Sequence, residues 1–301
     1  MAFRKTGSAL DRNENLAGAL FILPSFVGFL VFVLFPVVFS LFLSFNEWSF
    51  AGGFNTAKFV GLNNYLKLGK DEWFTSSLKN TLIFAVTTVP INLFLGVFFA
   101  VIIDKFVVFK TYAKVAVFVP YISSIVASAV IWLVMFHPSY GPINLFLTSV
   151  GITNPPKWFV DMKWALPSVI MFSIWQQFGY YILVYMAGLK GIPVELYEAA
   201  DIDGANEIHK FTKITLPMIS PTTFFLAILG IIGSFKVFDQ ISVLTEGGPG
   251  SATSVIAYYI YREAFQYYHM GLASAGAWVM FIIIFAITAF QWKYQKNWVN
   301  Y

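Results

Sequence analysis

The sequence predicts an all-α membrane protein with six transmembrane helices in a single domain. Of its 301 residues, 58% are hydrophobic and only 11% are charged, and the mean hydropathy is +0.71. A soluble domain has about twice that share of charged residues, so most apolar side chains are expected to face lipid or other helices. The apolar runs that are long enough to cross a bilayer cover about residues 16–45, 80–103, 112–136, 164–189, 222–243 and 272–292.

The first apolar run follows a short polar segment at the amino terminus. A cleaved signal peptide is the alternative interpretation. However, the run from Leu16 to Phe45 is about twice as long as a signal-peptide core and lacks a small-residue cleavage site. We therefore expect a membrane helix, which Pro24 and Pro36 kink.

The carboxyl-terminal third adds two further expectations to the pattern of spans and polar loops. Residues 244–270 begin with a Gly-Pro turn and continue as an aromatic-rich helix, capped near Thr253 or Ser254, which we expect to lie along the membrane interface. Small residues in the last span, among them Gly271 and Ala275, predict close packing against another helix.

Basic residues predict the orientation in the membrane. We place both termini, the turn at 105–114 and the loop from Lys190 to Pro221 on one side. That side then holds eleven Lys and Arg residues and the other side seven, with Lys236 inside a span. Because cytoplasmic loops carry the excess of Lys and Arg, we expect both termini in the cytoplasm.

Several classes of chemistry have no support in the sequence. There is no cysteine, and the three histidines are too scattered to suggest a metal site. No phosphate-binding loop of the form GxxxxGKS or GxxxxGKT occurs, so we expect neither ATPase nor other enzyme activity from this chain alone. We also expect no cofactor and no metal. We expect no nucleic-acid partner, because the net charge of +4 reflects basic residues at membrane edges.

The segment 191–221, between the fourth and fifth spans, predicts two short helices joined by a bend. Pro193 suits a first helical position, and Gly204 interrupts the helix that follows it. The second helix places Ala205, Ile208 and Phe211 on one stripe. Such an apolar stripe outside the membrane suits a groove on another protein. The alternative is a solvated loop whose helices lie on the bilayer surface.

The same segment resembles the EAA motif of permease subunits in binding-protein-dependent ABC importers. The resemblance lies in Glu198-Ala199-Ala200, then Gly204, then Ile214, then Leu216-Pro217, at matching spacings. Segments 61–65, 140–144 and 245–250 resemble the carbohydrate branch of that family, the maltose or multiple-sugar type. The resemblance covers nearly the whole chain, which lacks the additional amino-terminal helices of the longest members.

The resemblance implies a type I ABC-importer permease fold and a function in sugar import across a bacterial cytoplasmic membrane. It implies a second homologous permease subunit, two ATPase subunits that bind ATP, and an extracytoplasmic solute-binding protein. In that family the 191–221 loop is a coupling helix region that docks on the ATPase and drives alternating access. The implied coupling residues are Glu198, Ala199, Ala200, Asp203, Gly204, Ile208, Phe211, Ile214 and Pro217. For the two acids, a solvated helix rim is the alternative.

Polar residues on the fourth span predict a substrate path. Ser173, Gln176, Gln177 and Tyr180 occupy positions i, i+3, i+4 and i+7, which places them on one helix face. Amides are costly to bury in lipid without partners, so this face is expected to look into protein or a water-filled cavity. It would suit sugar hydroxyls, with Trp175 or Tyr181 as a stacking surface, or it would suit hydrogen bonds between helices.

The fifth span carries Lys236, Asp239 and Gln240. Lys236 and Asp239 are three residues apart and are expected to pair, either along the outer part of the path or as a local ion pair. Asn92 in the second span suits either role. The tight turns at 140–142 and 247–250 are further candidates for contact with a solute-binding protein, or plain turns.

Two other functions remain open at this point. Within ABC importers, the substrate would be glycerol phosphate or a polyol derivative rather than a di- or oligosaccharide. From a different class, the chain would be an ion-coupled secondary transporter or a channel that works alone. Proton coupling usually requires acids within the spans, and Asp104 and Asp239 are the candidates in this sequence.

Overall fold

A computed structural model describes residues 9–49, 52–53 and 56–297 of the chain. Four unbroken helices are long and apolar enough to cross a membrane: Leu16–Ser44, α4 (Glu72–Phe106), α8 (Ala165–Leu189) and α15 (Met270–Tyr294). Two further pairs of helices are bent, Lys110–Ile122 with Ile125–Met135 by 91° and Glu207–Met218 with Ser220–Phe235 by 60°. The total is six spans when each pair counts as one. The expected all-α, six-span class is therefore confirmed.

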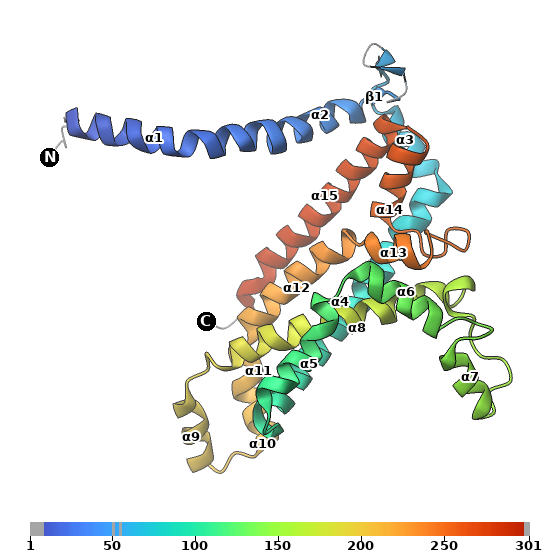
Figure 1. Cartoon of the computed structure of the whole chain (residues 1–301). Helices are drawn as coiled ribbons and strands as arrows, with labels where there is room; N and C mark the ends of the chain where they lie inside the picture. The colour runs from blue at the N-terminus through green and yellow to red at the C-terminus, as the bar shows by residue number, and fades with distance from the viewer. Residues whose placement is uncertain (1–8, 50–51, 54–55, 298–301) are drawn as a thin grey trace.

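The first span extends away from the other helices (Figure 1). It consists of α1 (Ala9–Phe29), a π-helical turn η1 (Leu30–Leu34) and α2 (Phe35–Ser44). Pro36 explains the wide turn, because its ring has no N–H to donate and crowds the carbonyl four residues earlier. The contacts of this span with the bundle come from α2, where the indole of Trp278 donates to Ser40 Oγ at 3.2 Å.

A small hairpin follows the first span. β1 (Asn46–Glu47) pairs antiparallel with β2 (Lys58–Phe59), and α3 (Asn63–Lys70) leads into α4. The buried amide of Asn64 donates to the carbonyls of Ser44 and Asn46, at 2.9 Å each. That one side chain therefore fixes the hairpin to the end of the first span.

The centre of the molecule is a bundle of α4, α8, α5 (Lys110–Ile122) and α12 (Ser220–Phe235). Glycine allows two of these helices to touch through their backbones. A Cβ on Gly179 of α8 would overlap the carbonyl of Val117 on α5. Small residues permit such close approach in membrane bundles, where dispersion forces hold helices together.

Short elements complete the fold. They are α6 (Ile125–Met135), α7 (Pro142–Ser149), η4 (Trp158–Val160), α9 (Val194–Ile202), α10 (Glu207–Lys210), η5 (Phe211–Thr215), α11 (Leu216–Met218), α13 (Asp239–Leu244), α14 (Ile256–Tyr261), η6 (Arg262–Gln266) and η7 (Gln295–Asn297). In Figure 1, the start of α1, the end of α15 and α9 lie toward the left, whereas β1, α3 and α7 lie toward the right.

Two predicted spans are broken where continuous helices were expected. The third bends by 91° between α5 and α6, where Ser123 is extended and Ser124 caps the new helix by accepting from the N–H of Ala127. The fifth ends at Phe235 rather than 243, and α13 begins separately at Asp239. Apolar residues continue on both sides of each break, so a search for long apolar runs joins the two parts into one span.

The aromatic-rich segment expected along the membrane interface begins instead inside the bundle. Ile256 and Tyr259 of α14 are fully buried, and α14 packs on α4 and α15. The N–H of Ile256 donates to Thr81 Oγ1 at 2.9 Å, and Asn80 Nδ2 donates to the carbonyl of Ser254 at 2.9 Å. These polar partners lie more than 170 residues earlier in the chain.

The contact at Gly179 generates a stability prediction. Gly179→Ala should lower the free energy of unfolding by about 1–3 kcal/mol, as overpacking does, because the methyl group forces α5 and α8 apart. Gly69→Ala in α3, where a Cβ would meet no heavy atom within 4 Å, is the matched control. Thermal unfolding of the two purified variants in detergent tests this, and equal melting temperatures would contradict the backbone contact.

Candidate functional site

The loop between α8 and α12 forms the predicted helix, bend and helix. α9 ends at Ile202, Gly204 adopts a φ of +75°, and α10 begins at Glu207. L side chains rarely adopt that φ, so glycine is the residue that makes the bend without strain. Pro193 caps α9 instead of opening it. The second helix is longer than expected, because α10, η5 and α11 run on continuously to Met218.

The end of this loop presents apolar side chains beside acids. Ile202 is 87% exposed and Ile208 is 76% exposed, one on each side of the bend. Glu198 and Asp203 are exposed on the same end. Exposed aliphatic side chains of this size, rimmed by charge, are typical of a protein–protein contact.

The other predicted coupling residues do not all face outward. Ala199 and Gly204 are exposed, whereas Ala200, Phe211, Ile214 and Pro217 are half-buried. Phe211 lines a groove of about 550 Å³ between the loop and the ends of α4 and α8, together with Val101, Leu189 and Tyr197. Ile208 also borders this groove, but it is 76% exposed whereas Phe211 is half-buried. Ile208 is therefore the more accessible of the two to a partner.

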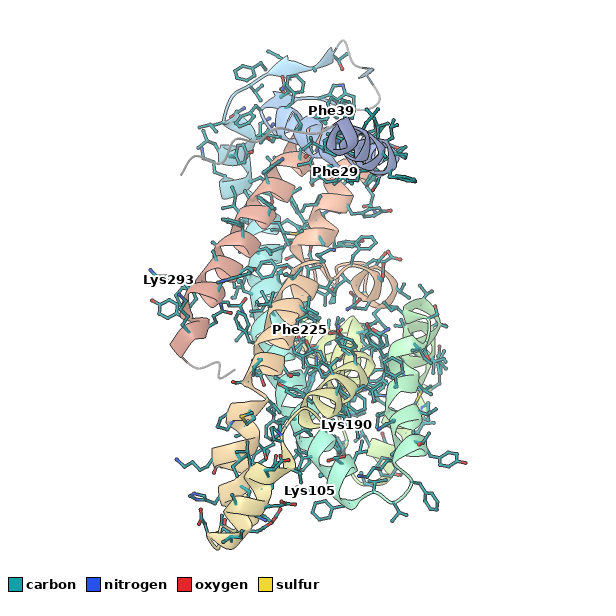
Figure 2. The ribbon with its side chains drawn as sticks, turned by 90° about the vertical axis from the view of Figure 1, so that its left-hand side faces the viewer. Phe29, Phe39, Lys105, Lys190, Phe225 and Lys293 are labelled. Carbon is teal, nitrogen blue, oxygen red and sulfur yellow. The ribbon has the colours of Figure 1, made fainter. Side chains whose placement is uncertain are left out.

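An ionic network that sequence reasoning missed fixes the shape of the loop. Lys210, whose side chain is only 11% exposed, pairs with Asp201 of α9 and with Glu207 of α10, the latter at 2.8 Å. Glu207 also pairs with Lys105 at the end of α4, where Oε2 lies 2.5 Å from Nζ. Figure 2 shows Lys105 at the lower end of the molecule, near this loop. The i, i+3 spacing of Glu207 and Lys210 was visible in the sequence, but the tie to Lys105 was not.

Uncharged contacts reinforce the same geometry. The hydroxyls of Tyr197 in α9 and Thr215 in η5 lie 2.8 Å apart. Asn206 caps α10 by accepting from the N–H of His209 at 2.8 Å. The two arms of the loop are therefore held together by a hydroxyl pair and an ionic bridge.

The charges of this network shift the pKa values of Glu207 and Lys210. The hydrogen bonds from Lys105 and then Lys210 lower the pKa of the Glu207 carboxyl, which lies outside the membrane-spanning segments, to about 2. The hydrogen bonds to Asp201 and then Glu207 raise the pKa of Lys210. Both groups are therefore ionised at neutral pH.

A second region gathers most of the predicted polar residues of the spans. A cavity of about 580 Å³ lies where α5, α6, α8, α12 and α13 meet. Six of the eight residues predicted for the substrate path line it: Gln176, Gln177, Tyr180, Lys236, Asp239 and Gln240. The helical spacing on α8 therefore correctly placed its two amides and Tyr180 on one surface.

Two of the predicted path residues lie outside this cavity. Ser173 is fully buried, and its hydroxyl donates to the carbonyl of Val169 at 2.8 Å and accepts from Gln240 Nε2 at 3.3 Å. It holds α13 against α8. Asn92 is buried on α4, and its Oδ1 has no hydrogen-bond partner among the residues that the structure describes.

The expected ion pair between Lys236 and Asp239 is wrong. Lys236 is the C-cap of α12, and Phe238, with φ −142° and ψ −54°, separates it from the first residue of α13. Because the helix breaks between them, the i, i+3 geometry is lost. Both side chains are exposed, and neither forms an ion pair within the described part of the chain.

The aromatic surface of the cavity differs from the one expected. Tyr121 of α5, which sequence reasoning missed, stacks on Tyr180 with ring centroids 5.0 Å apart and planes inclined by 20°. Trp175 instead packs on Trp132 and Phe172 in the core, at 5.4 and 6.0 Å. Tyr181, the other residue considered for stacking, does line the cavity.

Comparison with known proteins identifies relatives along most of the chain. The family model for the binding-protein-dependent transport system inner membrane component matches residues 80–294. The probable ABC transporter permease protein YesP of Bacillus subtilis is 38% identical over 96% of this chain and 94% of its own length. The sn-glycerol-3-phosphate transport system permease protein UgpA of Agrobacterium fabrum is 32% identical over 94% of this chain and 95% of its own.

A solved structure has the same fold. It is a bacterial alginate ABC transporter in complex with an alginate pentasaccharide-bound periplasmic protein. One of its chains superposes with a TM-score of 0.83 at 25% identity, and the match covers 98% of this chain and 98% of that one.

The ionic network generates a prediction on the loop itself. Glu207→Gln should broaden the distribution of distances between spin labels on Glu195→Cys and Lys213→Cys, because Lys105 and Lys210 lose their shared partner. The chain has no native cysteine to interfere. Lys110→Met, which removes an exposed pair with Asp104 at 3.4 Å outside the loop, is the control and should leave the distribution unchanged.

The pH dependence of that distribution follows from the sign of the shift. Because the pKa of the Glu207 carboxyl is lowered, its ion pairs with Lys105 and Lys210 are fully formed above the ordinary pKa of 4.5. They are lost only as pH falls toward about 2. The wild-type distance distribution should therefore be constant between pH 5 and 8, as electron spin resonance would report. Broadening within that window, or an unchanged distribution in Glu207→Gln, would contradict the role of the network.

Proposed function

Because this chain belongs to the family of binding-protein-dependent transport system inner membrane components, we propose that it forms half of the pore of an ATP-driven importer for a di- or oligosaccharide. The observation that carries this proposal is the bent loop that ends in exposed Ile202 and Ile208 and is tied to α4 by Lys105. It combines a surface for a partner with a rigid connection to the spans.

The loop is the proposed contact with a separate ATPase. The sequence has no phosphate-binding loop of its own, so ATP is bound by partner subunits. Ile202 and Ile208 would be buried in a cleft of the ATPase, and Glu198 and Asp203 would pair with basic groups at its rim. Gly204 sets the angle between the two arms that enter the cleft.

Movement of the loop would reach the spans by two routes. The Lys105–Glu207 pair joins α10 to the end of α4, and only Lys190 to Pro193 separate α8 from α9. Nucleotide-driven closure of the ATPases would therefore displace the ends of α4 and α8 together with the loop. Alternating exposure of the cavity to the two sides follows from such a displacement.

A second, homologous permease subunit is proposed to complete the pore. The cavity lined by Gln177 and Tyr180 would be closed by that subunit. The first span, with Phe21 86% and Phe32 79% exposed, stands apart from its own bundle and offers an apolar surface to that subunit and to lipid. A polar cavity would then lie at the interface between the two permeases.

A saccharide is the substrate class that the cavity suits best. Its amides and carboxylate offer donors and acceptors for hydroxyl groups, and the stacked Tyr121 and Tyr180 offer a surface for a sugar ring. The alginate transporter structure contains a pentasaccharide-bound periplasmic protein. Glycerol phosphate is the second candidate, because UgpA is a permease for sn-glycerol 3-phosphate.

The proposed location is the bacterial cytoplasmic membrane, with both termini and the coupling loop in the cytoplasm. The start of α1, the end of α15 and α9 lie toward one side of Figure 1, and the sequence segments assigned to the cytoplasm carry eleven of the nineteen Lys and Arg residues. A solute-binding protein would then approach the opposite side, where α7 and the turn at 247–250 lie. No cofactor is required of this chain.

The bend at Gly204 generates the test of this function. Gly204→Val should reduce ATP-driven sugar uptake at least tenfold while membrane insertion stays intact, because a β-branched residue strongly disfavours that φ, by about 1–2 kcal/mol or more. Gly204→Asn is the matched variant, because asparagine tolerates the left-handed region, and it should retain most of the uptake.

Uptake is measured in proteoliposomes that contain both permeases and the ATPases, with the solute-binding protein added. Normal transport by Gly204→Val would contradict the docking role of the loop. Solute movement by this chain alone, without ATP or partners, would instead identify a secondary transporter or a channel.

A further inference from the structure

The cavity contains a cation that no residue of the described chain neutralises. Lys236 ends α12, and its backbone N–H donates to the carbonyls of Ile232 and Gly233 at 3.3 and 3.1 Å. Its side chain is exposed and lines the cavity, and no carboxylate of the described residues lies within 4.0 Å of its ammonium group. Ionisable residues of membrane spans that face a water-filled cavity mark substrate paths.

Asp239 does not supply the missing charge. It opens α13, and the amino-terminal end of a helix stabilises a carboxylate without a cationic partner. Lys236, in turn, lies at the carboxyl-terminal end of α12, where a cation is favoured. The two opposite charges therefore line one cavity and each remains available to a ligand.

The rest of the lining suits a sugar ring beside that cation. Tyr180 stacks on Tyr121, and Gln176 and Gln177 offer two amides. The volume of about 580 Å³ is within the range of small-molecule sites. A ring on the tyrosines would leave its hydroxyl groups to the amides and to Asp239.

We propose that the substrate is an acidic saccharide and that Lys236 pairs with the carboxylate of a uronic-acid residue. This inference rests on the proposed import function and narrows its substrate class. A single ammonium group balances a carboxylate, which carries one negative charge. A phosphate, with up to two charges, would lack a second cation in this chain's lining.

The first part of the test compares substrates. The assembled transporter, with its ATPases, second permease and solute-binding protein, is reconstituted in proteoliposomes. Uptake is measured for the disaccharides of galacturonate, glucuronate and mannuronate, each beside its neutral hexose counterpart, and for sn-glycerol 3-phosphate. We expect at least one uronic disaccharide to be taken up at least tenfold faster than its neutral counterpart.

The second part tests Lys236 itself. Lys236→Met should reduce uptake of the preferred uronic disaccharide about tenfold or more, as loss of a charge-assisted hydrogen bond does, whereas Lys236→Arg should retain most of it. Lys163→Met, which removes an exposed lysine outside the cavity, is the control. Amounts of each variant in the membrane are measured in parallel, so that rates refer to equal quantities of protein.

The outcomes separate this inference from the function on which it rests. Uptake of neutral sugars but not of uronic ones would overturn the acidic substrate. Unchanged uronic uptake by Lys236→Met would overturn the pairing with Lys236. Either result would leave sugar import intact. Lys236-dependent uptake of sn-glycerol 3-phosphate alone would overturn the saccharide. Absence of ATP-driven uptake for every saccharide would contradict the proposed function itself.

Discussion

Lys210 lies between two carboxylates of the same loop, and the geometry of the loop depends on this contact. Asp201 approaches it from α9 and Glu207 from α10, while Glu207 reaches on to Lys105 at the end of α4. An isolated surface ion pair contributes little to stability. Here, however, four charges and a bend at Gly204 fix the direction in which Ile202 and Ile208 are presented. A loop with this shape can transmit a displacement to the spans.

The chain contains two candidate functional regions, the polar cavity and the bent loop. The polar cavity lies among α5, α6, α8, α12 and α13, beside the middle of α8, whereas the loop follows the carboxyl-terminal end of α8. Between them α4 and α8 are in contact along much of their length, with Gly96 of α4 seated against Tyr181 and Tyr185. Such close packing makes the two helices move as one body.

Hydropathy was enough to predict the class of fold and the number of spans, because a bilayer demands long apolar helices. It was not enough to predict their breaks. The bend after Ser123 depends on the cap that Ser124 forms on α6, and the end of α12 at Phe235 depends on the backbone conformation of Phe238. The burial of α14 depends on Asn80 and Thr81, which satisfy backbone groups far away in the sequence.

In the candidate site, too, spacing within one helix was predictable from the sequence, whereas contacts between different helices were not. Helical periodicity correctly placed Gln176, Gln177 and Tyr180 on one cavity wall. It failed for the pair of Lys236 and Asp239, because the helix that would have aligned them ends between the two. Tyr121 and Lys105 come from other helices, so no spacing within one helix could have identified them.

The central claim is that the bent loop contacts an ATPase subunit, and cross-linking tests it most directly. The native chain has no cysteine, so Ile202→Cys places a single reactive thiol on the loop, and Ile152→Cys, which is exposed beyond α7, serves as the control. In the assembled, transporting complex we expect a bifunctional maleimide to join Ile202→Cys to the ATPase and Ile152→Cys not to. A cross-link from Ile202→Cys to the solute-binding protein, or none to the ATPase in an active complex, would contradict the claim.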